Sequence, residues 1–189
     1  MEKQKTDLRV IRTKAAIRKA FCDMVLEMEY SDITVKALTQ QAMINRNTFY
    51  LHYASIDALL EDLENEIAQK FLSFYLACKG LQDVDIVIRN CLEYVMSQPP
   101  FHERIFFSSS YRFVAERINH KIMKGRKAVP GGLLGMSETA EDIALAYCGS
   151  VVAMLFRKWV SDGKQMPPEE LIRLATQVIH SGIDSIIWD

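Results

Sequence analysis

The sequence contains little of what a disulfide-linked, zinc-binding or membrane-spanning protein needs. Four cysteines are spread over 189 residues, and no two of them form a CxxC pair. Structural disulfides and a zinc site are therefore not expected. No apolar run reaches the length that spans a bilayer, and the basic N-terminal stretch lacks the apolar centre of a secretory signal. These absences predict a cytoplasmic protein that has reduced cysteines and no membrane partner.

Motifs that carry catalysis or bind cofactors are also missing. The chain has no Glu-x-x-His motif of the kind that holds di-metal sites in helical bundles. The segment PGGLLG lacks the lysine and the strand context of a phosphate-binding loop. His180 and Asp184 lie four residues apart, as do Glu116 and His120, but this spacing also fits a solvated helix face. We therefore expect neither an enzyme nor a bound metal or cofactor.

Apolar residues at helical spacing dominate what is present, and 49% of the residues are hydrophobic. In the first segment, Ile17, Phe21, Met24 and Met28 recur at intervals of three and four residues. No strand-rich segment, internal repeat or low-complexity tract interrupts this pattern. The sequence therefore predicts an all-α fold. Its clearest helices are expected over residues 6–29, 35–42, 46–53, 55–79, 138–161 and 168–187.

A helix-turn-helix is expected within the first 54 residues. Thr34 and Asn45 carry side chains that cap helix N-termini, and each precedes a short apolar-periodic segment. The three residues MIN form the turn between the two segments, which is the arrangement of a helix-turn-helix. Apolar residues four apart, Leu38 with Ala42 and Phe49 with Tyr53, are expected to face a small core. These patterns predict a three-helix head, residues 1–54, followed by a helical body, residues 55–189.

The outer side of the second short helix carries side chains that suit DNA. Its members are Arg46, Asn47, Thr48, Tyr50, Leu51 and His52. The major groove admits one helix, and Arg suits guanine whereas Asn suits adenine. Hydroxyl and imidazole groups can donate to phosphate oxygens. The same residues would also fit the ordinary surface of a small helical domain.

Basic residues are concentrated at the N-terminal end of a chain whose formal net charge is −1. Residues 1–56 hold nine Lys and Arg against six Asp and Glu, whereas the remaining residues hold fourteen against eighteen. A basic head on an acidic body suits contact with phosphate groups. A solvated basic helix without a partner would have the same composition.

Two segments, RTKAAIRKAFCDMVLE and TVKALTQQAMINRNTFYLHYASIDALL, resemble the DNA-binding head of the TetR family of bacterial transcription regulators. The resemblance covers residues 9–62 and rests on Thr34, Ala42, Thr48-Phe49-Tyr50, His52-Tyr53 and Leu59-Leu60. The ending RKWVSDGKQMPPEELIRLATQVIHSGI is loosely similar to a subgroup that includes regulators of dihydroxyacetone metabolism. The resemblance implies an all-α regulator with an N-terminal DNA-binding head and a C-terminal helical body for dimerisation and ligand binding.

The resemblance also implies a set of DNA-contacting residues, to which the cap residue Asn45 is added. The set is Thr34, Lys36, Asn45, Arg46, Asn47, Thr48, Tyr50, Leu51 and His52. Two positions depart from the family pattern. Glycine usually stands where Met43 is found, and a left-handed backbone there would carry strain of about 1 kcal/mol. Lysine often stands where Ile56 is found, and Ile56 cannot supply a phosphate contact, so Lys36 or the basic first helix would have to compensate.

The last two helices are expected to form a homodimer interface. Their apolar stripes consist of Val151, Val152, Leu155, Trp159, Ala175, Ile179, Ile183 and Ile186. One helix-turn-helix of this size buries little groove surface, and two copies reading half-sites one helical turn apart roughly double the contact. The alternative is that part of these stripes faces the protomer's own core.

The middle of the chain is rich in aromatic residues and methionine, a composition that fits both ligand pockets and ordinary cores. TetR-like regulators often enclose an inducer pocket in this region. The candidate lining residues are Tyr75, Cys91, Tyr94, Tyr111 and Tyr147. Some members of the family respond to a protein partner instead.

Together, these patterns predict a transcription regulator that binds double-stranded operator DNA as a homodimer. The operator is expected to be near-palindromic, and the effector to be a small molecule or a protein. Two alternatives share the helical fold: a small-molecule-binding protein whose head does not read DNA, and an interaction protein that contacts another regulator.

Overall fold

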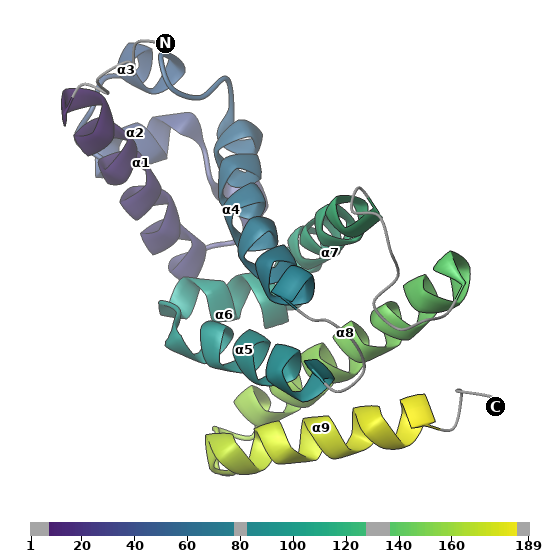
Figure 1. Cartoon of the computed structure of the whole chain (residues 1–189). Coiled ribbons are helices and arrows are strands. Elements are labelled where there is room, and N and C mark those ends of the chain that lie inside the picture. The colour runs from purple at the N-terminus through teal and green to yellow at the C-terminus, as the bar shows by residue number, and fades with distance from the viewer. Residues whose placement is uncertain (1–7, 78–82, 128–136, 185–189) are drawn as a thin grey trace. The chain divides into compact units, whose positions relative to one another are not determined.

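The computed structural model describes residues 8–77, 83–127 and 137–184. In these ranges the chain forms α-helices and short 3-10 helices (labelled η) and no strand (Figure 1), so the predicted all-α fold is confirmed. The chain divides into two compact units. We call residues 1–66 with 99–115 the head unit, and residues 67–98 with 116–189 the body unit.

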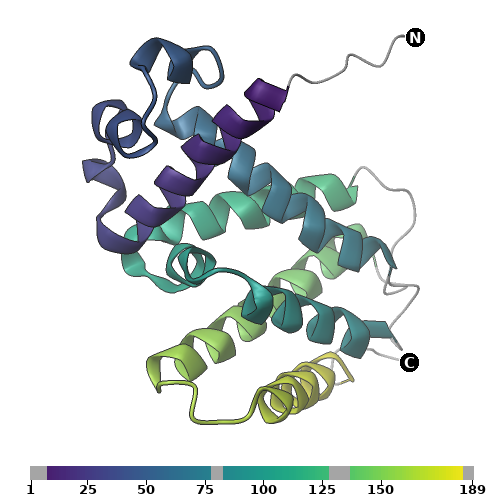
Figure 2. The same cartoon turned by 90° about the vertical axis from the view of Figure 1, so that its left-hand side faces the viewer.

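The head unit is built around α1 (Leu8–Glu27), which packs against α2 and α6 (Figure 2). Its other elements are η1 (Tyr30–Asp32), α2 (Val35–Gln41), α3 (Arg46–Tyr50), the first half of α4 (Ile56–Ala77), α6 (Pro100–Phe107), η3 (Ser109–Tyr111) and the start of α7 (Arg112–Lys127). Pro100 occupies the first position of α6, where its missing N–H has no intrahelical partner to lose. The buried core includes Ile17, Phe21, Met24, Leu38, Phe49, Leu59, Leu60 and Ile105.

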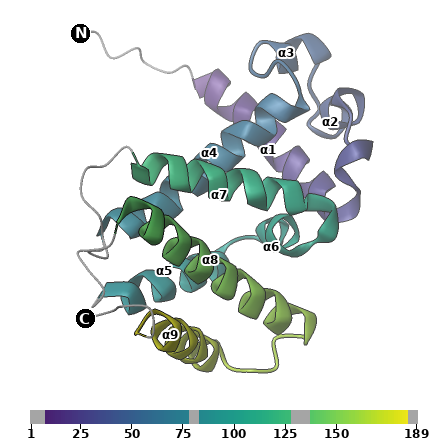
Figure 3. The same cartoon turned by 90° about the vertical axis from the view of Figure 1, so that its right-hand side faces the viewer.

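The body unit contains α5 (Val84–Ser97), α8 (Glu138–Ser161), α9 (Pro168–Asp184) and the second halves of α4 and α7. Helices α8 and α9 pack against each other, and α5 packs against both (Figure 3). The buried core includes Ile88, Leu92, Ile118, Phe156, Leu171 and Ile179. Arg126 in α7 is also buried and forms ion pairs with Glu141 and Asp142 in the first turns of α8.

Helix boundaries agree best with the sequence where a capping residue marks them. The predicted helix 138–161 matches α8, which begins after the N-cap Ser137. The helix predicted over residues 46–53 ends at Tyr50 instead. There the N–H groups of both His52 and Tyr53 donate to the carbonyl of Phe49, at 2.9 Å each, which tightens the chain into a turn. The expected start of the first helix and end of the last lie outside the described residues.

Helix α8 is long and apolar enough to cross a membrane by length and composition alone, with a mean hydropathy of 1.4 over its best window. The sequence analysis expected no such run. A third of that window is buried inside the protein, where α8 packs on α9 and α5. A core helix of a helical unit has the same composition, so α8 by itself is weak evidence for a membrane.

Candidate nucleic-acid interface

The helix-turn-helix is held in shape by caps at both of its short helices. The Thr34 hydroxyl accepts a hydrogen bond from the N–H of Ala37 at 3.2 Å and so caps α2. The Asn45 side chain accepts one from the N–H of Asn47 at 2.8 Å and caps α3. Both capping predictions are confirmed. Caps matter here because α2 and α3 have seven and five residues and cannot be stable on their own.

The turn between the two helices closes with a left-handed residue, Met43, whose φ is +53°. Its N–H donates to the carbonyl of Gln40 at 3.1 Å, and the N–H of Ile44 donates to that of Thr39 at 3.0 Å. This bonding pattern is a Schellman motif, in which glycine is the usual left-handed residue. Met43 therefore carries the strain that the sequence analysis expected, and its side chain is 91% exposed.

The inner side of α3 is anchored by aromatic packing. Phe49 is fully buried, and its ring lies 6.0 Å from that of Tyr53, measured between centroids. The Tyr53 hydroxyl donates to the Asp62 carboxylate on α4 at 3.0 Å, and Lys14 of α1 lies over the Tyr53 ring. Burial, with the Asp62 hydrogen bond as a lesser cause, raises the pKa of Tyr53 to about 12. Tyr53 therefore stays protonated at neutral pH and fastens α3 to α4.

The outer side of α3 presents the predicted DNA-contacting residues to solvent. Arg46, Asn47, Tyr50 and Leu51 are exposed, with exposed fractions of 55% for Tyr50, which carries a hydroxyl donor, and 82% for the apolar Leu51. The rest of the set divides by burial: Thr34, Lys36 and Asn45 are exposed, whereas Thr48 and His52 are half-buried. All nine residues lie on α2, α3, their caps or the turn that follows, so the head unit brings them together on adjacent elements.

The start of α4 lacks the positive charge that the family often has there. Ile56 is half-buried, and the acidic residue of the first turn is Asp57. The Asp57 carboxylate accepts a hydrogen bond from the Tyr30 hydroxyl at 2.5 Å, which ties η1 to α4. This end of α4 therefore has a structural role in the head unit. Helix α2 carries one cation, Lys36, and it is exposed.

The predicted pocket residues are only partly brought together. Tyr75 and Cys91 share a core cluster with Val87, and the Tyr94 ring lies 5.5 Å from that of Phe71, which packs against the same cluster. Tyr147 lies instead beside α9, where its hydroxyl donates to the Val178 carbonyl at 3.4 Å. Tyr111 belongs to the core of the head unit, where it is fully buried.

The buried thiols of this region stay protonated at neutral pH. Burial raises the pKa of Cys91 to about 12 and that of Cys148 to about 11. It also raises the pKa of the Tyr75 hydroxyl, with both thiols as lesser causes. The Tyr75 cluster is thus an uncharged, aromatic environment. A separate open groove of about 630 Å³ runs along α5 and α9, but it is lined by charged residues such as Arg89 and Glu169 and by none of the predicted pocket residues.

Several residues of the predicted dimer stripes serve the protomer itself. Val151, Trp159, Ala175 and Ile179 are buried in the body unit. The Trp159 indole N–H donates to the Met166 carbonyl at 2.7 Å, which fastens the link between α8 and α9. Of the rest, Val152 and Leu155 are half-buried, and Ile183 and Ile186 lie where no side chain is described.

Another set of apolar residues on the same two helices faces solvent, and the sequence analysis missed it. Ile143 and Met154 on α8 are 67% and 60% exposed, and Leu174 and Val178 on α9 are exposed too. Tyr147 lies four residues after Ile143 and seven before Met154, so these three residues share one face of α8. The Tyr147 hydroxyl also binds the Val178 carbonyl, which places this face beside α9. The recurrence of apolar residues at helical spacing after Ile143, at Tyr147 and Met154, would have indicated this face from the sequence.

Comparisons with known proteins agree with this architecture, although no family model matches the sequence. The HTH-type transcriptional regulator YxbF of Bacillus subtilis (strain 168) is 26% identical over 182 residues, which are 91% of this chain and 46% of YxbF. The chain thus spans about half the length of this relative.

Solved structures share the fold at lower sequence identity. The TetR transcriptional regulator from Streptococcus agalactiae 2603V is 22% identical with a TM-score of 0.61, over 90% of this chain and 95% of that one. The dihydroxyacetone kinase operon activator DhaS is 20% identical with a TM-score of 0.53, over 92% of this chain and 97% of that one. At these identities the likeness concerns the fold alone.

The chain therefore belongs to the class of all-helical proteins that have a helix-turn-helix head and a helical body. More particularly, the chain has the fold of the TetR family of transcription regulators, and the resemblance seen in its sequence is confirmed. Its similarity to the dihydroxyacetone subgroup stays a prediction.

Proposed function

We propose that the protein is a transcription regulator that binds operator DNA through the exposed side of α3. The observation that carries this proposal is the exposed set Arg46, Asn47, Tyr50 and Leu51, held on a helix whose other side is anchored by the buried Phe49. A helix that is capped, anchored and polar on its free side suits insertion into the major groove.

Each residue of the set has a chemical role in this proposal. Arg46 and Asn47, at the start of α3, would contact base edges, since their side chains can form paired hydrogen bonds with guanine and adenine. Thr48, Tyr50 and His52 would donate to phosphate oxygens and fix the register of the head on the duplex. Lys36 would supply phosphate contact from α2, where Ile56 cannot.

We further propose that the protein acts as a homodimer through α8 and α9. Three exposed apolar residues of these helices, Ile143, Met154 and Val178, support this proposal. An exposed apolar face of this kind is typical of a protein-protein interface. A twofold pair of heads would read two half-sites of a near-palindromic operator.

The effector is proposed to bind near the Tyr75 cluster of the body unit. Tyr75 and Cys91 belong to this cluster, and burial raises the pKa of both side chains, so they are uncharged at neutral pH; the Tyr94 ring packs beside them on Phe71. Such a lining suits a largely apolar small molecule. A protein effector is the alternative, and the cytoplasm is the proposed location of the whole system.

Selection of bound duplexes from a random pool tests the function. We expect one near-palindromic sequence to be enriched and to bind more tightly than a scrambled duplex of the same composition. A pool that shows no enrichment after several rounds would favour a helical binding protein whose head does not read DNA.

A further inference from the structure

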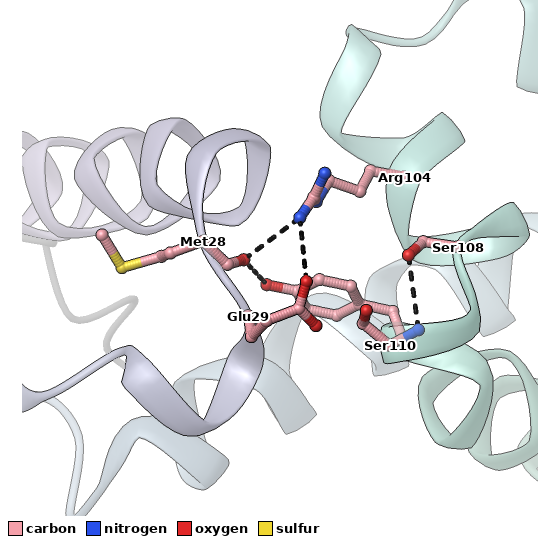
Figure 4. A network of polar contacts seen from close by, with 6 residues as sticks. Met28, Glu29, Arg104, Ser108 and Ser110 are labelled. Carbon is pink, nitrogen blue, oxygen red and sulfur yellow. Dashed lines mark hydrogen bonds and ion pairs between the residues drawn. The ribbon is translucent and has the colours of Figure 1, made fainter.

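Side chains from a distant part of the chain form hydrogen bonds with the junction between α1 and the helix-turn-helix. Helix α1 ends at Glu27, and the next carbonyl, that of Met28, accepts a hydrogen bond from the Tyr111 hydroxyl at 2.9 Å (Figure 4). The Arg104 guanidinium approaches the same carbonyl and the Glu29 carboxylate, at 3.5 Å each (Figure 4). Carbonyls at a helix C-terminus lack intrahelical partners, so Tyr111 and Arg104 act as a cap supplied from more than 70 residues away.

The same junction is held from its other side. The Tyr30 ring packs edge-on against the Tyr111 ring with centroids 6.4 Å apart, and it lies 5.1 Å from the Phe113 ring. The Tyr30 hydroxyl donates to Asp57 at the start of α4. Only η1 and its flanking residues separate α1 from the cap of α2. Contacts from η3, α7 and α4 therefore fix the whole link that leads into the helix-turn-helix.

Tyr111 and Arg104, which form these hydrogen bonds, are themselves held in place by burial and ring packing. Tyr111 is fully buried, and burial raises its pKa, so its hydroxyl stays protonated and remains a donor. The Arg104 guanidinium lies over the Tyr111 ring at 5.9 Å from its centroid. Its Nε is buried without a hydrogen-bond partner among the described residues, so Arg104 is held through its Nη2 atom and the Tyr111 ring. The Nη2 contacts to Met28 and Glu29 help to keep it in place.

We propose that Tyr111 and Arg104 are positioning residues for DNA binding, which fix the direction in which η1 and α2 leave α1. This inference rests on the proposed function, because it concerns how the head is presented to an operator. Neither residue contacts DNA. They raise affinity because a head held in its binding orientation loses less conformational freedom when it binds.

The test compares two variants that each remove one hydrogen bond from the same segment. Tyr111→Phe removes the bond to Met28 and keeps the buried ring. Ser108→Ala removes the bond that the Ser108 hydroxyl accepts from the N–H of Ser110 at 3.3 Å, which does not reach α1 (Figure 4). We expect Tyr111→Phe to weaken binding to the selected duplex by roughly three- to ten-fold, and Ser108→Ala to leave it unchanged. Binding is measured well below the melting midpoints of both variants, where unfolded protein is negligible.

Two further readouts separate positioning from general destabilisation. The salt dependence of Tyr111→Phe binding should match that of the wild type, because no phosphate contact is lost. Arg104→Met should weaken binding, and Arg104→Lys should recover part of it by restoring a cation near Met28 and Glu29. If the wild type selects a duplex and Tyr111→Phe binds it as tightly as Ser108→Ala does, the inference is overturned and the proposed function stands. A wild type that selects no duplex overturns the proposed function, and this inference with it.

Discussion

The head unit and the body unit expose opposite kinds of surface. In the head unit, the exposed side of α3 carries the hydrogen-bonding side chains of Arg46, Asn47 and Tyr50 beside Leu51, and a fully buried Phe49 lies behind it. In the body unit, α8 exposes Ile143 and Met154 although its other side is already buried. A polar surface on an anchored helix suits a partner rich in charge and hydrogen-bonding groups, such as DNA, whereas the apolar surface suits a second protein chain. We therefore propose that the head recognises DNA and that the body carries the dimer interface.

The strongest way to break this division is to remove the anchor of α3. Phe49→Ala leaves a cavity in the small head core and should lower the free energy of unfolding of the head by about 3–5 kcal/mol. DNA binding should be lost, whereas the dimer should persist because α8 and α9 are untouched. Circular dichroism, DNA titration and sedimentation velocity measure the three quantities. Loss of the dimer together with DNA binding would contradict the division.

The corresponding change in the body targets its exposed apolar face. Ile143→Glu should weaken dimerisation by roughly five- to more than a hundred-fold, because a charge would have to be buried in the interface, at a cost of about 1–3 kcal/mol. Ile86→Glu is the matched control, since Ile86 is 57% exposed on α5, outside the proposed interface. Sedimentation equilibrium should show a monomer for the first variant and a wild-type dimer for the second. Equal behaviour of the two variants would rule out α8 as the interface.

A smaller effect is expected from single contacts on α3. Arg46→Ala should cost roughly 1–3 kcal/mol of binding and relax the preference for the selected duplex over a scrambled one. Tyr50→Phe should weaken binding to both duplexes alike, because it removes a phosphate contact. Arg112→Ala, an exposed arginine at the start of α7, serves as the control. Isotherms that do not change for Arg46 and Tyr50 would show that another surface reads DNA.

Backbone strain offers a milder comparison between the two units. Met43 in the head and Lys164 in the body both have left-handed backbones, with φ of +53° and +57°. Replacing either by glycine should raise the free energy of unfolding by about 1 kcal/mol. Urea titrations of the two variants check this. Only Met43→Gly is next to the proposed DNA-reading helix, so a change in DNA affinity is possible for that variant alone. Lower stability in both variants would show that the left-handed backbone is not strained there.

Near pH 6, the smallest expected effect is a pH dependence of the stability of the head. Burial of His102 on α6 lowers its pKa to about 4. A base whose folded pKa lies below its unfolded value of about 6.5 takes up protons on unfolding, so head stability should fall as pH decreases from about 6.5 towards 4. His102→Phe should flatten this slope near pH 6, above the range where carboxylates titrate. A slope that is unchanged in the variant would remove His102 as its source.

The sequence predicted the head more completely than the body, for a physical reason. The caps Thr34 and Asn45 and the inward side of α3 follow from local chemistry and from one apolar face. Helix α8 is apolar on more than one side, so periodicity placed Val151 and Trp159 on a stripe without showing whether that stripe faces the core. The structure buries both, and the exposed face lies at Ile143 and Met154.

Long-range contacts were beyond prediction from sequence. Tyr111 was assigned to a ligand pocket because of its aromatic neighbours, yet its hydroxyl binds the carbonyl of Met28, 83 residues away. No local pattern in a single sequence encodes such a pairing. The end of α3 at Tyr50 was also not predicted; three residues later the Tyr53 hydroxyl binds Asp62 of α4, a contact that helical periodicity does not encode.

DNA recognition by α3 is best tested by the salt dependence of wild-type binding to the selected duplex, compared with a scrambled duplex. We expect the selected duplex to bind more tightly at every salt concentration and both affinities to fall steeply as salt rises, because phosphate contacts release counterions. We also expect a stoichiometry of one dimer per selected duplex. Equal affinity for the two duplexes, or binding that does not respond to salt, would contradict the claim that the exposed side of α3 reads DNA.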